Sequence, residues 1–324
     1  LPPTKEQTLQ STCAKASLES GHTNTVQTYD ESSYPAEVDS NLLSFEVKGV
    51  LGKGGFATVL LVRYKQNGSL YAMKRMKLKP PEGQDEELHH AIINQELDVL
   101  SLNAICPSPF LLSLKTWLIA DEHIYFVTDF FNGGNLAQLL KKFPPHNRLP
   151  EHIAQFYCAE MAVAIGQVHQ RHLLHCDIKL DNFLISHDGH IVLADFGLST
   201  SDMKTNVYGG TYKYMAPERL CNKPYEMASD WWSLAICIYI LLFGKHPVWD
   251  DSVSPLYNID NLVNYAIEVE EVDYVRNPYA YSFLRQMLTN EPEFRLGYGP
   301  DGFKKVLDHP YIFNFDRSKL FRRE

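Results

Sequence analysis

A short loop between two apolar segments carries the residues best suited to chemistry. The stretch "HLLHCDIKLDNFLI" runs from His172 to Ile185, and its polar members are Asp177, Lys179, Asp181 and Asn182. Two carboxylates, an ammonium and an amide are gathered within six residues, while the ends of the stretch are apolar. The pattern predicts a loop whose side chains could do chemistry and which is held between two short strands.

The residues after this loop predict a metal site. "FLIS", "HDGH" and "IVLAD" form a predicted hairpin that turns at Asp188-Gly189. Asn182 precedes the first strand and Asp195 ends the second, so strand pairing brings the two residues to the open end. Two adjacent oxygen side chains near a phosphate site suit Mg²⁺. Polar caps on a hairpin would explain either residue alone, but they explain both poorly because Phe196-Gly197 follow directly.

A lysine and a glutamate predict an ion pair that holds phosphate. Lys74 lies in "YAMK" on a predicted strand, and Glu96 shares a predicted helix face with Leu88, Ile92 and Leu100. An unpaired carboxylate on an inward face is costly, so Lys74 is the expected partner of Glu96. Such a lysine can also hold the α- and β-phosphates of a nucleotide. A solvated charge on an edge strand is the alternative for Lys74 taken alone.

"LGKGGFATV", from Leu51 to Val59, predicts a phosphate-binding loop. Gly52, Gly54 and Ala57 also fit the dinucleotide-binding pattern G-x-G-x-x-[GA], but that motif should open a helix. Here "TVLLVRY" follows, which predicts a strand. A glycine-rich loop between two strands therefore fits better, because small residues let backbone N–H groups approach phosphate oxygens. An ordinary hairpin turn is the alternative for this motif alone.

The elements that position these residues divide the chain into a strand-rich and a helix-rich part. Residues 1–43 lack apolar periodicity and predict a flexible arm. Three antiparallel strands follow, the last two joined at a tight turn at Asn67-Gly68, then a helix from Leu88 to Leu102 and a strand in "HIYFVTDFF". Beyond Gly133-Gly134 the pattern is mostly helical, beginning with an amphipathic helix from Pro150 to about His169.

Composition limits the class of protein. The 324 residues are 45% apolar and 21% charged, as in globular proteins with one large or two ordinary domains. A net charge of −9 argues against a general nucleic-acid binder. Six cysteines without a C-x-x-C pair favour a reduced intracellular protein over a disulfide scaffold or a zinc site. The apolar run from Trp231 to Phe243 is too short to span a bilayer and predicts a buried helix.

Together these motifs resemble the catalytic domain of eukaryotic protein kinases, over residues 45 to 315. The signature residues of that family occur here in order and at matching spacing: Gly52, Gly54, Ala57 in place of a third glycine, Lys74, Glu96, Asp177, Lys179, Asn182, Asp195-Phe196-Gly197 and Ala216-Pro217-Glu218. The segments "SDWWSLA", "FRLGYG" and "HPYIFNFDRSKL" resemble the AGC group of serine/threonine kinases.

The resemblance implies an α+β protein kinase fold with two lobes. One is a small antiparallel β-sheet with one key helix, and the other is larger and mainly helical. The expected boundaries are a flexible arm at 1–43, the first lobe at 44–131, the second lobe at 132–315 and the start of a C-terminal tail at 316–324.

The implied reaction is transfer of the γ-phosphate of ATP to a serine or threonine of a protein substrate. Asp177 is expected to orient and deprotonate the acceptor hydroxyl, and Lys179 to steady the γ-phosphate. Lys74, fixed by Glu96, should hold the α- and β-phosphates. Thr211, ahead of "YKYMAPE", is typical of serine/threonine kinases.

The resemblance also implies where the cofactors bind. Mg²⁺, for which Mn²⁺ can substitute, is expected at Asn182 and Asp195. The residues expected to line the ATP site are Leu51, Gly52, Lys53, Gly54, Gly55, Phe56, Ala57, Val59, Ala72, Lys74, Thr128, Asp129, Phe131 and Leu184. Two supporting contacts are implied as well: Glu218 should pair with Arg295, and Asp230 should brace the catalytic loop.

Two other classes of protein share parts of this pattern. A pseudokinase that acts as a nucleotide-binding scaffold would be expected to have lost Lys74, Asp177 or Asp195, and all three are present. A small-molecule kinase of the aminoglycoside-phosphotransferase kind should lack the peptide-binding segment "GTYKYMAPE". The expected partner is therefore a protein substrate, with no nucleic acid and no membrane span. The expected location is intracellular, cytoplasmic or nuclear, and the sequence does not indicate an oligomeric state.

One departure from the family concerns regulation. Many kinases carry an arginine between the histidine and aspartate of the catalytic loop, where it binds a phosphate on the activation segment. Here that residue is Cys176, and the usual phosphothreonine position, four residues before Thr211, is Val207. Both halves of the switch are missing. We therefore expect activity without phosphorylation, with residues 198–212 held by packing and neutral hydrogen bonds. Redox sensing is the alternative to a buried reduced thiol at Cys176.

Overall fold

The structure, a computed structural model, divides the chain into two compact units. The strand unit comprises Leu1–Asn132 with Asp195–Gly197, and the helix unit comprises Gly133–Ala194 with Leu198–Glu324. The residues that the structure describes are 38, 40–55, 57–83, 85–203, 209–264, 266–269, 272 and 275–324. The arm expected at residues 1–43 therefore lies mostly outside the described residues, as do Phe56 and Val207.

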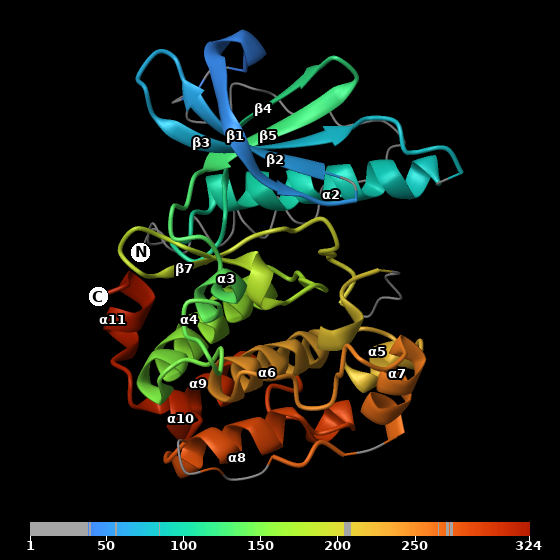
Figure 1. Ribbon diagram of the computed structural model, residues 1–324, viewed down its shortest axis with the longest axis vertical. Helices are drawn as coiled ribbons and strands as arrows, with labels where there is room; N and C mark the ends of the chain where they lie inside the picture. The colour runs from blue at the N-terminus through green and yellow to red at the C-terminus, as the bar shows by residue number, and fades with distance from the viewer. Residues whose placement is uncertain are drawn as a thin grey trace, which may run out of the picture. The chain divides into compact units, whose positions relative to one another are not determined.

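The strand unit is built on a five-stranded antiparallel sheet (Figure 1). A 3₁₀ turn, η2 (Leu42–Ser44), precedes it. The strands, in spatial order, are β1 (Phe45–Lys53), β2 (Ala57–Tyr64), β3 (Leu70–Lys77), β5 (His123–Asp129) and β4 (Leu114–Ala120). The predicted turn between β2 and β3 is confirmed, because Gly68 has a φ of +77° and its amide donates to the Tyr64 carbonyl at 2.8 Å.

Strand β4 was not predicted, and its turn explains why. The β4–β5 hairpin turns at Asp121 and Glu122, with φ values of +49° and +62°. Such turns are normally marked by glycine or asparagine, which tolerate positive φ. Two acidic residues give no such signal, so the chain before His123 did not stand out as a strand.

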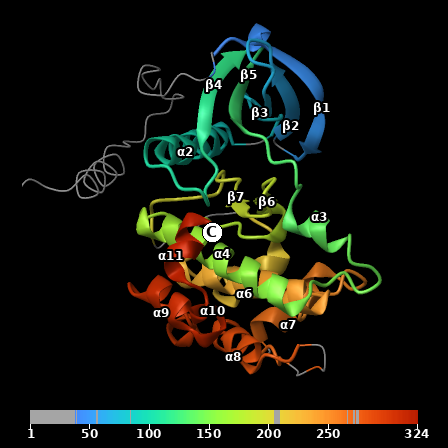
Figure 2. The same ribbon diagram turned by 90° about the vertical axis from the view of Figure 1, so that its left-hand side faces the viewer.

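Helix α2 (Glu86–Ile105) lies beside β4 in the strand unit (Figures 1 and 2). It begins at Asp85, whose carboxylate accepts the amides of Glu87 and Leu88 at 2.9 and 3.1 Å. Glu96 and Leu100 are buried as expected, but Leu88 is 53% exposed in the first turn. The buried face of α2 therefore begins later along the helix than the sequence predicted.

The helix unit is centred on two long helices, α4 (Glu151–Gln170) and α6 (Met227–Phe243), which lie side by side (Figure 2). Both were predicted, and nearly all residues of α6 are buried. The other elements are α3 (Leu136–Leu140), η3 (Leu180–Asn182), β6 (Phe183–Ile185), β7 (Ile191–Leu193), η4 (Tyr212–Tyr214), α5 (Pro217–Leu220), α7 (Pro255–Asn264), α8 (Pro278–Met287), η5 (Pro292–Phe294), α9 (Gly302–Asp308), α10 (Pro310–Phe313) and α11 (Arg317–Arg322).

These two units confirm the expected fold class, a sheet-based part with one long helix and a mainly helical part. The expected start of a tail at residues 316–324 contains α11, which buries Leu320. Among the described helices, none combines the length and apolar character needed to cross a membrane.

The cysteines follow the sequence expectation with one exception. Cys158, Cys176, Cys221 and Cys237 are free thiols. Cys106, at the end of α2, is disulfide-bonded. This bond departs from the expectation of a reduced protein, while the four free thiols agree with it.

Candidate active site

The catalytic loop of the helix unit holds three side chains in a closed network. Lys179 Nζ donates to Asp177 Oδ2 at 2.5 Å and lies 3.2 Å from Thr211 Oγ1. Thr211 donates to Asp177 Oδ1 through its hydroxyl at 3.0 Å and its backbone amide at 3.1 Å. Both carboxylate oxygens of Asp177 are thus held in fixed directions. A carboxylate positioned in this way can accept a proton from a hydroxyl brought to it.

Asp230 on α6 supports the catalytic loop through hydrogen bonds to the loop backbone, as expected. Its side chain is fully buried and accepts the backbone amides of His175 and Cys176 at 3.0 and 3.1 Å. Tyr225 donates its hydroxyl to Asp230 Oδ1 at 2.7 Å, and His169 Nε2 lies 2.9 Å from Oδ2. Burial alone would raise the pKa of Asp230, but the hydrogen bond and charge of His169, followed by His175, outweigh it and lower that pKa.

The backbone conformation of the catalytic loop brings its amides to Asp230. Cys176 has a φ of +66°, an unfavourable conformation for a residue with a Cβ. His175 is buried, with Nε2 3.2 Å from the Ala194 carbonyl and Nδ1 accepting the Asp177 amide at 3.3 Å. Both ring nitrogens are therefore occupied, which indicates a structural role for His175.

The predicted hairpin after the loop is present. Phe183 of β6 pairs with Leu193 of β7, and the Ala194 amide donates to the Asn182 carbonyl at 2.9 Å. Asn182 also donates its side-chain Nδ2 to the Asp177 carbonyl at 2.8 Å. This bond fixes the orientation of the side-chain amide group. Asp195 follows Ala194 directly and supplies a carboxylate. Oxygen ligands of these two kinds fit Mg²⁺.

The predicted ion pair lies in the strand unit. Lys74 on β3 donates to Glu96 Oε1 and Oε2 of α2 at 2.6 and 2.8 Å and to Asp195 Oδ1 at 2.8 Å. Burial would lower the pKa of Lys74, but the charges of Asp195 and then Glu96 outweigh it and raise that pKa. Lys74 is therefore a permanent cation, suited to holding phosphate.

The glycine-rich segment joins β1 to β2 and is exposed. A Cβ added at Gly52 or Gly55 would meet no atom within 4 Å, and one at Gly54 would meet only the Ala57 carbonyl, at 3.8 Å. The fold itself therefore leaves open space around this loop, which a phosphate group can approach closely.

The other residues expected to line the ATP site have these positions. Within the sheet Ala72 pairs with Thr128, which is buried, and Val59 pairs with Lys74. Leu51 and Lys53 are exposed on β1, Asp129 ends β5 and pairs with Lys115 at 3.3 Å, and Phe131 is half-buried just beyond. Leu184 lies on β6 of the helix unit.

Glu218 and Arg295 form the ion pair that the sequence predicted. Arg295 Nη1 and Nη2 lie 2.8 and 2.9 Å from the two oxygens of Glu218, and both side chains are buried. The guanidinium also lies 5.1 Å from the ring centroid of Trp232. This pair anchors α5, which follows the activation segment, to the core of the helix unit.

Cys176 lies in an apolar cluster where many kinases have an arginine. Leu174, Cys176 and Tyr225 form its buried part, and Leu198, Met203 and Met227 pack against it. Leu198 and Met203 belong to the activation segment. Burial and the nearby charge of Asp230 raise the pKa of the Cys176 thiol well above its ordinary value. The thiol is therefore neutral.

Backbone hydrogen bonds hold the start of the activation segment to the catalytic loop. The amide of Leu174 donates to the carbonyl of Thr200 at 2.8 Å, and the amide of Thr200 donates back at 3.0 Å. The Ser199 hydroxyl donates to the His175 carbonyl at 3.4 Å. These contacts need no charge.

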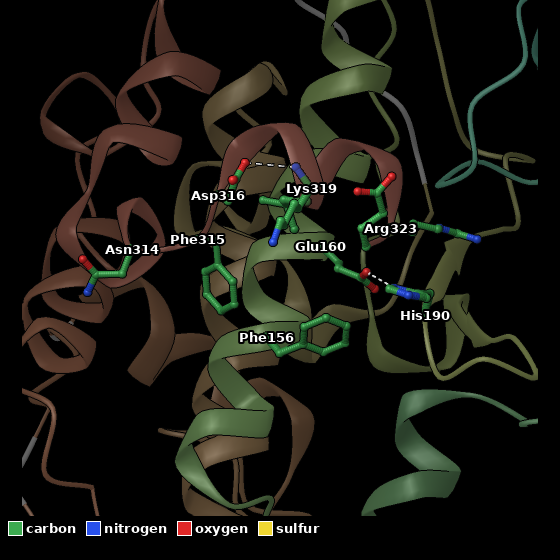
Figure 3. Close-up of a pocket in the computed structure, with 10 residues that line it drawn as sticks. Phe156, Glu160, His190, Asn314, Phe315, Asp316, Lys319 and Arg323 are labelled. Carbon is green, nitrogen blue, oxygen red and sulfur yellow. Dashed lines mark hydrogen bonds and ion pairs between the residues drawn. The ribbon is translucent and has the colours of Figure 1, made fainter.

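The helix unit also has a cavity of about 250 Å³ between α4, α11 and the residue before β7 (Figure 3). Figure 3 shows Glu160 of α4 facing His190, whose Nδ1 lies 2.5 Å from Glu160 Oε1. Arg323 donates to the carbonyl of Ile191 and ties the end of α11 to β7. None of the predicted site residues lines this cavity.

Comparison with known proteins identifies the family. The sequence model of the protein kinase domain matches residues 45–312, and the chain belongs to this family. The chain is 36% identical to the RAC serine/threonine-protein kinase of Drosophila melanogaster over 86% of this chain and 44% of that protein. It is 32% identical to the serine/threonine-protein kinase sgk-1 of Caenorhabditis elegans over 86% of this chain and 58% of that protein.

A shorter relative is covered more fully. The chain is 33% identical to the human serine/threonine-protein kinase Sgk2 over 86% of this chain and 73% of that protein. The chain spans about half the length of the worm and fly relatives. All three are serine/threonine kinases of the AGC group, which confirms the resemblance seen in the sequence.

Sequence reasoning missed part of this site. It noted Thr211 as a marker of kinase class but did not expect its bonds to Asp177, and it did not single out Tyr225. Thr211 and Asp177 are 34 residues apart, and no local pattern marks such a contact.

Proposed function

We propose that the protein transfers the γ-phosphate of ATP to serine or threonine hydroxyls of protein substrates. The observation that carries this proposal is the network of Asp177, Lys179 and Thr211. This network holds the Asp177 carboxylate in a fixed orientation beside the Lys179 cation. Its third member, Thr211, belongs to the segment expected to bind peptide. Membership of the protein kinase family supports the same reaction.

Each polar residue then has a task. Asp177 orients the acceptor hydroxyl and takes its proton as the oxygen attacks the γ-phosphorus, while the bond from that phosphorus to the β–γ bridging oxygen breaks and ADP leaves. Lys179 neutralises charge on the transferring phosphoryl group. Lys74, held by Glu96, binds the α- and β-phosphates. The acceptor is a protein because Thr211 links Asp177 to a segment that family resemblance assigns to peptide binding.

Asn182 and Asp195 are the proposed ligands of Mg²⁺, or of Mn²⁺ as a substitute. The metal, when bound, neutralises phosphate charge and orients the nucleotide. The chain's own part is to hold the oxygens: the Asn182 amide by its bond to the Asp177 carbonyl, and the Asp195 carboxylate by its bond to Lys74.

We further propose that catalysis does not depend on phosphorylation of the activation segment. In place of an arginine and a phosphate, the structure has an apolar cluster and neutral hydrogen bonds around Cys176. Because ATP is the phosphate donor, the proposed place of action is inside the cell, in cytoplasm or nucleus.

The direct test is transfer of radiolabelled phosphate from ATP to myelin basic protein. Wild type should label the substrate only when Mg²⁺ or Mn²⁺ is present. Asp177→Asn should lower kcat by about 10²- to 10⁴-fold because the positioned base is lost. Asp181→Asn, an exposed residue of the same loop, is the matched control and should keep kcat within about twofold.

A pseudokinase scaffold is the second candidate. It predicts that the purified protein binds Mg-ATP but labels neither myelin basic protein nor any peptide on a broad array. Phosphorylation of kanamycin without labelling of protein would instead indicate a small-molecule kinase. Either result contradicts the proposed function.

A further inference from the structure

His246 occupies an unusual position beside the peptide-binding segment. It lies in the connection between α6 and α7, two residues after Gly244, which ends α6 with a φ of +72°. Nothing in its sequence context, "FGKHPVW", indicates a role. Its side chain is half-buried and reaches back to η4, the turn that directly follows Thr211.

Both ring nitrogens of His246 bond to backbone groups. Nδ1 accepts the amide of Val248 at 3.1 Å and the amide of Trp249 at 2.6 Å. Nδ1 therefore carries no proton, and in a neutral imidazole the proton must lie on Nε2. Nε2 lies 2.6 Å from the carbonyl oxygen of Lys213 and donates to it.

The surrounding groups keep this tautomer neutral. Burial lowers the pKa of His246 to about 4 and outweighs the bond to the Lys213 carbonyl, which raises it. The charged groups that act on the ring are Lys213, which lowers the pKa further, and Asp251, which raises it. At neutral pH the ring is a fixed acceptor on one side and a fixed donor on the other.

The contact to Lys213 is a side-chain bond to a backbone carbonyl of η4, and the neighbouring carbonyl has one as well. Ser233 of α6 donates its hydroxyl to the Tyr214 carbonyl at 2.7 Å. His246 holds the neighbouring carbonyl, of Lys213, from the α6–α7 connection. The turn itself begins at Thr211, whose carbonyl accepts the Tyr214 amide at 2.9 Å.

This turn lies next to the proposed base in the chain. Thr211 bonds to Asp177, and the next residue, Tyr212, is 58% exposed. A substrate whose hydroxyl reaches Asp177 would come close to η4, because this turn begins directly after Thr211. A displacement of η4 would weaken binding of the substrate protein, while the contacts of Lys74 in the strand unit would be unchanged.

We propose that His246 is a positioning residue for protein-substrate binding, which fixes η4 through its Nε2–H bond to the Lys213 carbonyl. This inference rests on the proposed kinase function. It assigns His246 to recognition of the acceptor protein and not to the nucleotide or to proton transfer.

Two substitutions separate the roles of the two ring nitrogens of His246. In His246→Gln, the side-chain amide can place an N–H near the position of Nε2 and restore the donor to Lys213. In His246→Asn, the shorter amide can place an oxygen near the position of Nδ1 but cannot reach Lys213. His309→Asn is the control, because His309 Nδ1 also accepts a backbone amide, that of Tyr311 at 3.2 Å, but at α10.

The experiment measures KM for myelin basic protein and KM for ATP in each variant, with thermal unfolding as a folding check. His246→Asn should raise KM for the protein by about three- to tenfold, the size of one lost hydrogen bond. Its KM for ATP should stay within about twofold. His246→Gln should restore most of the protein KM, and His309→Asn should change stability only.

The inference is overturned if His246→Asn leaves the protein KM unchanged, or if it raises both KM values alike. It is also overturned if the Gln and Asn variants do not differ, since the Nε2 donor would then be irrelevant. Wild type without any transfer to protein would contradict the proposed function itself, and this outcome is separate from the variant comparison.

Discussion

At the scale of the residue, Asp177 is the group on which the catalytic contacts converge. Its two oxygens bond to Lys179 and Thr211, and its backbone carbonyl accepts the side chain of Asn182. A carboxylate that is held in this way would need little reorganisation to act as the proposed base when a hydroxyl arrives. The geometry thus assigns Thr211 a positioning task beside its value as a marker of kinase class.

Thr211→Val tests this task. Valine keeps the shape of threonine but removes the hydroxyl, so Asp177 and Lys179 each lose a partner. A bond to a charged group contributes about 1.5–3 kcal/mol, so loss of the bond to Asp177 alone should lower kcat by about 10- to 100-fold. Thr211→Ser keeps the hydroxyl and should stay near wild type. Equal kcat values for the Val and Ser variants, measured on myelin basic protein, would show that the hydroxyl does not position the base.

Cys176 should be chemically inert in the folded protein. Burial raises the pKa of its thiol, so at pH 8 the reactive thiolate is rarer than in an ordinary cysteine. Iodoacetamide at pH 8 should modify exposed Cys221 and leave Cys176 unmodified, as read by peptide mass spectrometry. Labelling in urea, where both thiols are accessible, is the control. Equal labelling of the two thiols in the native protein would favour the redox-sensing alternative.

At the scale of the element, helix α6 organises the helix unit. Its first turns provide Asp230 for the catalytic loop, Trp232 beneath Arg295 and Ser233 for η4. The buried apolar pattern of α6 was clear from the sequence. The bond of Ser233 to the Tyr214 carbonyl was not, because it joins residues 19 positions apart that only folding brings together.

The Glu218–Arg295 pair should be a strong stabilising contact. Glu218→Gln leaves the Arg295 guanidinium buried without its countercharge, so the free energy of unfolding should fall by about 3–5 kcal/mol. Urea denaturation followed by circular dichroism measures the loss. Lys304→Ala breaks an exposed pair with Asp308 on α9 and should have no measurable effect. If the two variants proved equally stable, the pair would not anchor α5.

The activation segment should depend on the apolar character of the cluster around Cys176. Cys176→Arg introduces a charge among apolar side chains and close to Arg219, whose charge already acts on this thiol. The free energy of unfolding should fall by about 2 kcal/mol or more, whereas Cys176→Ala should lose only about 1 kcal/mol. Urea denaturation distinguishes them, and an arginine variant more stable than wild type would contradict packing as the means of support.

At the scale of the whole molecule, the sequence predicted the fold class and the Lys74–Glu96 and Glu218–Arg295 ion pairs, and the roles of the site residues stay predictions. Lys74 and Glu96 could be paired because an acid on an apolar helix face demands a cation. Strand β4 was missed because Asp121 and Glu122 adopt positive φ without glycine. The bonds of Thr211 to Asp177 and of His246 to Lys213 were not predicted, since they join residues 34 and 33 positions apart that no local pattern links.

We propose above all that this protein kinase is active without a phosphate on its activation segment. The most direct measurement is phosphorylation of myelin basic protein by enzyme treated with phosphatase and then purified from it. We expect most of the activity to remain, because packing of Leu198 and Met203 and neutral backbone hydrogen bonds hold the start of the segment, and the bonds of Thr211 to Asp177 hold its end. Loss of activity on treatment, with recovery on phosphorylation of one hydroxyl of the segment, would contradict the account. The hydroxyl-bearing candidates are Ser199, Thr200, Ser201, Thr205 and Tyr208.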